Sequence, residues 1–203
     1  MALITRTPTC KPPWPIILVA GAEKAGKTYA CALASTSPHI GRTLWISIGE
    51  DDPDEYGAIP GARFEIVEHD GTWAGIMTAV RGAVAEPDVD GKPTLIVVDS
   101  MSREWDLLSD MAQVMANRRE AKRQQRSRTP SEGDEVRIGM DLWNLVKSRH
   151  AALLDVLRDH DGPCCSLPGW NAPRSWTTPA SRRSKRTTRS RPRSRWCSMW
   201  APW

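Results

Sequence analysis

The most informative stretch of this chain is Ile16-Ile17-Leu18-Val19-Ala20-Gly21-Ala22-Glu23-Lys24-Ala25-Gly26-Lys27-Thr28. Its first five residues are continuously apolar, which is the pattern of a short strand buried on both faces of a parallel sheet. Its last eight residues fit GxxxxGK[ST], where glycines permit a tight turn whose backbone N–H groups point at phosphate oxygens. Alanine-rich sequence follows and predicts a helix, whose N-terminus would add the positive end of its dipole. The stretch therefore predicts a phosphate-binding loop at 21–28, and the alternative is a coincidental glycine-rich turn.

The residue types in this loop indicate that the ligand is a nucleoside triphosphate, ATP, bound together with Mg²⁺. Lys27 would neutralise the β and γ phosphates, and the Thr28 hydroxyl would bind the magnesium ion. The candidate ATP-binding residues of the loop are Gly21, Ala22, Glu23, Lys24, Ala25, Gly26, Lys27 and Thr28.

The chain up to residue 162 alternates strand-like and helix-like segments. Apolar runs predict strands at 43–48, 63–67 and 94–98, and helical periodicity predicts helices at 28–35, 71–85, 101–117 and 141–160. Strands separated by helix-length segments favour a parallel sheet with crossover helices. We therefore expect a three-layer α/β domain at 14–162 that binds nucleotide at the carboxyl ends of its strands. A proline-rich, extended lead-in at 1–13 precedes it.

A carboxylate at the end of a neighbouring apolar strand would complete a magnesium site. Asp99 directly follows the run 94–98 and is the candidate ligand, together with Thr28. The alternative role for Asp99 is to cap the helix that follows it. Ser100 is a further candidate for contact with the γ-phosphate or its water, and it is equally suited to capping that helix.

The sequence Leu95-Ile96-Val97-Val98-Asp99-Ser100 resembles the magnesium-binding strand of the RecA-like ATPases. In that family a catalytic glutamate stands at the end of the strand that follows the phosphate-loop helix, and the matching position here is Glu50. The resemblance implies that Glu50 orients the attacking water and acts with Lys27 in catalysis, with Asp51 as the second choice. A solvated acidic loop is the alternative for both carboxylates.

More closely, several segments resemble the phage-encoded RecA-like ATP-binding proteins of actinobacterial viruses, over about residues 14 to 162. These segments are Gly49-Glu50-Asp51, Asp54-Glu55-Tyr56-Gly57-Ala58, Phe64-Glu65-Ile66-Val67-Glu68-His69-Asp70-Gly71-Thr72-Trp73, Asp99-Ser100-Met101 and Ile138-Gly139-Met140-Asp141-Leu142-Trp143-Asn144. The resemblance implies a P-loop NTPase fold and a Mg²⁺-dependent ATPase of phage DNA recombination or replication. In this hypothesis assembly into a homo-oligomer lets hydrolysis move or release DNA, in the cytoplasm of the host.

The segment 118–128 is rich in arginine and has no apolar face, so we expect a mobile basic loop there. Its guanidinium groups suit the phosphates of single-stranded DNA. It has no aromatic residue that would stack bases, which favours a solvated loop instead. Two other functions stay open: a small-molecule or nucleotide kinase with this loop as its lid, and a nucleotide-binding switch without turnover.

Residues 163–203 differ from the rest of the chain in charge and composition. They hold nine Lys or Arg and no Asp or Glu, which leaves 19 basic residues against 24 acidic ones in 1–162, a net charge of −5. Five of the ten tryptophans lie there among Arg, Ser, Thr and Pro without any period. We hypothesise that a frameshift near Pro163 has replaced the native C-terminus with a disordered tail, so that the C-terminal strands of the sheet are missing. A genuine basic tail that binds nucleic acid is the alternative.

No apolar run approaches the roughly 20 residues that cross a bilayer. The first residues also lack the basic and apolar regions of an export signal. We therefore expect a soluble cytoplasmic protein with no membrane partner.

Overall fold

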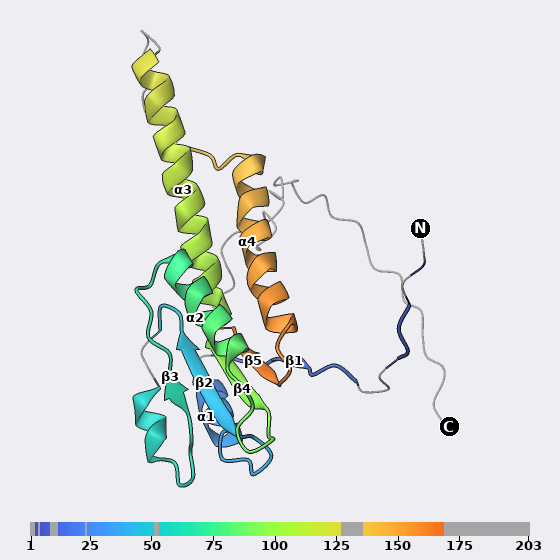
Figure 1. Cartoon of the computed structure of the whole chain (residues 1–203). Coiled ribbons are helices and arrows are strands. Elements are labelled where there is room, and N and C mark those ends of the chain that lie inside the picture. Colours follow the sequence, from blue (N-terminus) through green and yellow to red (C-terminus); the bar gives the residue numbers. More distant parts are fainter. Residues whose placement is uncertain are drawn as a thin grey trace, which may run out of the picture. The chain divides into compact units, whose positions relative to one another are not determined.

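The computed structural model describes residues 3, 5–8, 12–22, 24–50, 53–126 and 136–168, all of them within the unit Met1–Asn171 (Figure 1). Regular structure begins after the prolines of the lead-in. In chain order the elements are β1 (Ile16–Leu18), α1 (Lys27–Ala34), β2 (Arg42–Ser47), the 3₁₀ helix η1 (Asp54–Ala58), β3 (Glu65–Ile66), α2 (Trp73–Ala85), β4 (Thr94–Asp99), α3 (Met101–Arg126), α4 (Met140–Arg158) and β5 (Cys164–Leu167).

The strands of the described residues form one parallel sheet in the order β1-β5-β4-β2-β3. β4 lies at its centre and pairs along its whole length with β2, from Arg42 opposite Thr94 to Ser47 opposite Asp99. On its other side β4 pairs with β5, where Asp99 stands opposite Leu167. The predicted parallel α/β sheet is therefore confirmed, and all its strands end at the same edge.

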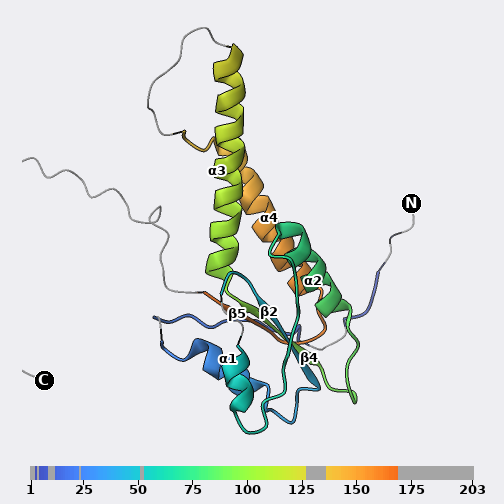
Figure 2. The ribbon, with the colours of Figure 1, turned by 90° about the vertical axis from the view of Figure 1, so that its left-hand side faces the viewer.

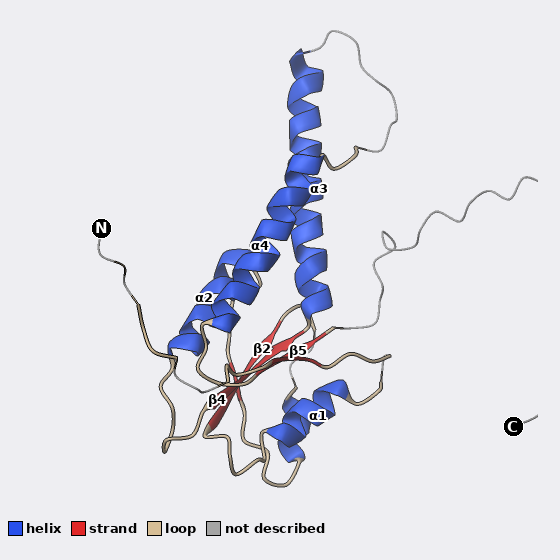
Figure 3. Ribbon diagram, turned by 90° about the vertical axis from the view of Figure 1, so that its right-hand side faces the viewer, coloured by secondary structure: helices blue, strands red, loops and turns tan. Residues whose placement is uncertain are grey.

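Helices cover both faces of this sheet (Figures 2 and 3). In β4, Leu95 and Val97 belong to the apolar cluster under α1, whereas Ile96 and Val98 belong to the cluster under α2 and α4. This alternation follows from the two-residue period of a strand, and residues 95–98 of β4 are all apolar because both faces of the strand are covered. The described elements thus form three layers, with α1 and η1 on one side of the sheet and α2 and α4 on the other.

β1 is an edge strand among the described residues, which corrects the prediction that it is buried on both faces. It pairs with β5 alone, and Ile17 and Leu18 are 44% and 64% exposed. The strand also ends at Leu18, two residues earlier than the apolar run predicts. A continuous apolar run therefore does not guarantee that both faces of a strand are covered, and it does not say whether the strand has one neighbour or two.

β5 corrects the prediction that the domain ends at residue 162 and lacks the next strand. Cys164, Cys165, Ser166 and Leu167 are all buried, and they pair with β1 on one side and β4 on the other. The printed sequence therefore supplies the strand that joins β1 to the rest of the sheet. The hypothesis of a frameshift near Pro163 that leaves a disordered tail stays a prediction, because residues 169–203 lie outside the described part of the chain.

α3 corrects the expected basic loop, because the helix continues without a break to Arg126. Its N-terminal part packs on α4 through a cluster that includes Leu108, Ala112 and Leu142. The buried Glu104 carboxylate accepts a hydrogen bond from Nδ1 of His150 on α4 at 2.9 Å, and this contact raises the pKa of His150. Residues 127–135, which include the rest of the predicted loop, lie outside the described residues.

The placement of β5 gives a direct test of the boundary at residue 162. Leu167 is fully buried between α1 and the sheet, so Leu167→Ala should lower the free energy of unfolding by about 2–5 kcal/mol. Leu33→Ala is the matched control, because Leu33 is 47% exposed on α1 and its truncation should cost less than about 1 kcal/mol. Urea unfolding followed by circular dichroism measures both. If Leu167→Ala were as stable as the parent, residues 163–168 would not form part of the folded domain.

Candidate functional site

The loop 21–28 connects β1 to α1 with the backbone that its glycines permit. Gly26 has φ 79° and precedes the first residue of α1, so the helix begins without a side chain over its N-terminus. Lys24 also has a positive φ, of 60°, and the Ala25 N–H donates to the Ala22 carbonyl at 3.2 Å. A turn of this kind leaves the first N–H groups of the helix open to an anion.

Lys27 folds its side chain over the same loop. Its ammonium donates to the carbonyl oxygens of Gly21 at 3.1 Å and Ala22 at 3.0 Å. The charge of the side chain is therefore held beside the N–H groups of the loop, where both attract an anion. Glu23 lies outside the described residues.

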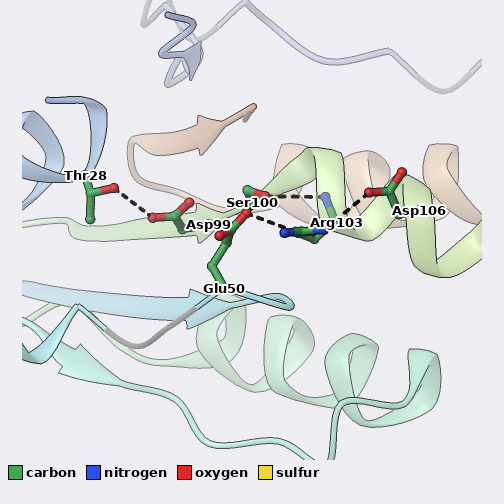
Figure 4. A network of polar contacts seen from close by, with 6 residues as sticks. All are labelled: Thr28, Glu50, Asp99, Ser100, Arg103 and Asp106. Carbon is green, nitrogen blue, oxygen red and sulfur yellow. Dashed lines mark hydrogen bonds and ion pairs between the residues drawn. The ribbon is translucent and has the colours of Figure 1, made fainter. Parts of the chain in front are cut away.

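The hydroxyl of Thr28, on the helix that follows β1, contacts β4, which lies two strands from β1 in the sheet. It donates to Oδ2 of Asp99, the last residue of β4, at 3.3 Å (Figure 4). The pKa of Asp99 is raised to about 6, chiefly because burial disfavours the charged carboxylate. The hydrogen bond from Thr28 and the charge of Lys27 oppose this rise, and the nearby charge of Glu50 adds to it.

Glu50 lies beside Asp99 and is held by two polar partners (Figure 4). Its Oε1 atom accepts hydrogen bonds from the Ser100 hydroxyl and from Nε of Arg103, both at 3.2 Å. The Glu50 and Arg103 side chains are 41% and 48% exposed, so this ion pair is accessible to water. Glu50 is thus paired with Arg103 at a solvent-accessible position, while Asp51 lies outside the described residues.

Ser100 fills the capping role that the sequence allows. Its side-chain oxygen accepts from the Arg103 N–H at 3.4 Å, and its carbonyl accepts from the Glu104 N–H at 3.1 Å. The Asp99–Ser100 peptide bond that precedes the helix is cis. The cap is thus Ser100 rather than Asp99, which leaves the Asp99 carboxylate directed at Thr28.

The arrangement combines three chemical functions at one edge of the sheet. Lys27 and the N-terminus of α1 attract anions, the oxygens of Thr28 and Asp99 are hard donors that fit Mg²⁺, and Glu50 is a carboxylate able to accept a proton. Mg²⁺ usually keeps several waters and takes only one or two carboxylates together with phosphate oxygens, so two protein donors are enough. The site lies where ligands bind in parallel α/β sheets.

Most of the residues that the sequence suggests for this site lie together, and Arg103 lies with them. Lys27, Thr28, Asp99, Ser100 and Glu50 come together as the strand order requires. Arg103 is 48% exposed, and it bonds Glu50 and approaches Asp106 at 3.9 Å. The signal for Arg103 was its position three residues after the helix cap, because this spacing turns its side chain back toward the strand ends.

Comparisons with known proteins add no relative to this picture. No family model matches the sequence, and no curated protein matches it. Within the described residues, no helix combines the length and the apolarity that crossing a bilayer requires.

The raised pKa of Asp99 predicts a pH-dependent effect on stability. Because the folded protein holds this proton more tightly than the unfolded chain, the carboxylate lowers stability as pH rises from about 4 to about 6, and the loss is complete above that range. Asp99→Asn should leave the unfolding free energy nearly unchanged at pH 4. At pH 8 it should raise it by about 1–2 kcal/mol, once the partial exposure of the carboxylate is allowed for.

Urea unfolding at both pH values measures this effect. Asp110→Asn is the control, because Asp110 is exposed on α3 and should give the same small change at each pH. An Asp99→Asn protein that is no more stabilised at pH 8 than at pH 4 would show that the carboxyl has an ordinary pKa.

Proposed function

We propose that this chain binds ATP with Mg²⁺ as a P-loop NTPase of the RecA-like type. The observation that carries the proposal is the contact between the Thr28 hydroxyl and the Asp99 carboxylate at 3.3 Å, beside the ammonium of Lys27. Residues 71 positions apart meet at this contact, and each has the chemistry that a magnesium–phosphate complex needs. A coincidental glycine-rich turn would have no reason to place a hydroxyl on a half-buried carboxylate.

Each residue would then contribute to binding through a simple interaction. The N–H groups of the loop and the first turn of α1 would donate to phosphate oxygens, and Lys27 would exchange the carbonyls of Gly21 and Ala22 for phosphate. Thr28 and Asp99 would hold the magnesium ion, which supplies positive charge near the phosphates. The ion would also remove the cost of the buried Asp99 charge, because a cation favours the ionised carboxylate.

Hydrolysis is the second part of the proposal, and it depends on Glu50. A carboxylate near the phosphates can orient water and accept its proton. Glu50 lies next to Asp99 and is exposed enough to meet a water molecule. On β5, which lies between β1 and β4, the residue opposite Asp99 is the aliphatic Leu167. At that position β5 therefore offers no polar side chain to the proposed site. We therefore expect slow turnover, with Glu50 as the main catalytic residue.

The alternatives gain no specific support from the described residues. The kinase hypothesis used 118–128 as a lid, but Arg118 lies on a helix 15 residues beyond Arg103, about 22 Å along its axis. That end of α3 is too far away to close over the phosphates. A binding switch without turnover differs from the proposal only in the role of Glu50. The assignment to phage DNA recombination rests on the sequence resemblance alone.

Nucleotide binding is tested with two lysines of the same loop. Lys27→Gln should weaken Mg²⁺–ATP binding about 10-fold to 100-fold, because it removes charge-assisted hydrogen bonds to phosphate. Lys24→Gln removes the same charge from an exposed position of the loop and should change the affinity less than about threefold. Isothermal titration calorimetry with a non-hydrolysable ATP analogue gives both constants. Equal losses in the two variants would mean that general attraction, not a phosphate site, holds the nucleotide.

Turnover is tested by separating it from binding. Glu50→Gln should lower the rate of phosphate release about 100-fold or more and leave the affinity for Mg²⁺–ATP within about threefold, because only proton transfer is lost. Glu68→Gln, at an exposed position, is the control and should match the parent. A parent chain that binds ATP but releases no phosphate would support the switch without turnover. Wild-type turnover in Glu50→Gln would remove Glu50 from the mechanism.

A further inference from the structure

The outer end of α3 extends beyond the helix on which its lower part packs. Arg119 of α3 forms an ion pair with Asp141, next to the start of α4 at Met140. From there α3 continues to Arg126, and residues 121–125 are exposed. Figures 1 and 2 show this end of α3 projecting past α4. We call residues 118–126 the basic arm.

The basic residues of the arm gather on one side of the helix. At 100° per residue, Arg118, Lys122, Arg119 and Arg123 fall within a sector of about 140°. Glu120, Ala121, Gln124 and Gln125 fall outside it. The even spread of charge that suggested a loop in the sequence is therefore a cationic stripe once the backbone is helical.

The same side of α3 changes from apolar to charged where the helix passes the start of α4 at Met140. Nearer the N-terminus of α3 this side carries Leu108, Ala112 and Ala116, which are buried against α4. One turn later it carries the cationic stripe. The helix therefore presents an apolar side where a partner helix is present and a charged side where none is found among the described residues. Only Ala121 is apolar within the arm, so packing does not explain why the sequence stays helical there.

The charge of the arm contrasts with the charge of the body that carries it. Residues 1–117 hold nine basic and 16 acidic residues, a net charge of −7, whereas 118–126 hold five basic and one acidic, a net charge of +4. Arg119 pairs with Asp141, and Arg123 lies 3.7 Å from Glu120. Among the described residues, Arg118 and Lys122 have no acidic partner. A polyanion would therefore be attracted to the arm and repelled by the rest of 1–126.

We propose that the basic arm binds the phosphate backbone of duplex DNA without regard to base sequence. Cations one helical turn apart, about 6 Å, present a straight row of charges that suits a rigid backbone of regularly spaced phosphates. Single-stranded DNA fits less well because the arm has no aromatic side chain on which to stack exposed bases. An anionic membrane fits less well because a helix at a bilayer surface needs an apolar side to insert.

This proposal goes beyond the nucleotide site and does not depend on it. Arg118 lies about 22 Å along α3 from Arg103, so the two sites are separate surfaces. Duplex binding should occur without nucleotide, and Lys27→Gln should bind duplex DNA like the parent. Failure of ATP binding and failure of DNA binding are therefore distinguished by different variants.

The experiment measures binding of the full chain to a fluorescein-labelled 24-base-pair duplex by anisotropy, between 50 and 200 mM KCl. The variant is Arg118→Gln with Lys122→Gln. The control is Arg81→Gln with Lys92→Gln, which removes the same charge from exposed positions of α2 and the following loop. The basic residues of 163–203 are present in every protein, so they do not affect the comparison. Circular dichroism verifies that each variant keeps the helix content of the parent.

We expect the arm variant to lose at least about tenfold in affinity at 50 mM KCl. The slope of log K against log salt should become shallower by about 1.8, since each lost phosphate contact contributes about 0.9. The control should keep the slope of the parent. In the parent, duplex DNA should also protect Lys122 from acetylation but not Lys92.

Two results would overturn the proposal. Equal changes in the two double variants would mean that total charge and not the arm determines binding. The second result is tighter binding of a single-stranded DNA of the same length, with the arm variant changing the salt slope for the single strand but not for the duplex. It would show that the arm binds single-stranded DNA and not the duplex.

Discussion

A carboxylate withdrawn from water at the end of β4 is the constraint on which the site depends. Asp99 is costly to ionise where it lies, and its pKa is raised to about 6 by burial. The Thr28 hydroxyl offsets part of this cost and so ties the first turn of α1 to the centre of the sheet. Because β5 stands between β1 and β4, it separates the strand that precedes α1 from the strand that carries Asp99. The conformation of the loop 21–28, the position of Asp99 and the order of the strands are thus linked.

This dependence explains why a short strand of unusual sequence matters so much. The sequence of β5, Cys164-Cys165-Ser166-Leu167, differs from the aliphatic residues 95–98 of β4. Ser166 also has a buried hydroxyl without a hydrogen-bond partner among the described residues. The strand nevertheless pairs on both sides, and its small side chains leave room for Cys31 and Ala32 of α1. Burial raises the pKa of the Cys164 thiol to about 12, so this thiol stays neutral and apolar in the core.

The sequence predicts the parts of this protein in which a local pattern and the tertiary environment agree. β2 and β4 are apolar in their middle residues, 44–46 and 95–98, because helices cover both faces, and the loop 21–28 carries its glycines at a tight turn between strand and helix. The errors occur where neighbours far along the chain decide the outcome. The run at 16–20 gives no sign that β1 has a single neighbour, and the polar segment after Asn117 has no apolar period because it extends past α4. Its basic residues recur at helical spacing, which was the signal to use there.

The candidate site divides into a rigid part and a soft part, and the division follows burial. Asp99 belongs to the sheet and Ser100 to the cap of α3. Moving either residue would leave buried polar groups without hydrogen-bond partners, at a cost of about 1–3 kcal/mol each. Glu50 is held by partners in an exposed ion pair, which in other proteins contributes only about 0.2–1 kcal/mol. Ligand phosphates that attract Arg103 could therefore release Glu50 at little cost. The carboxylate proposed to hold the metal is fixed in advance, and the carboxylate proposed to act on water is the one that is free to turn.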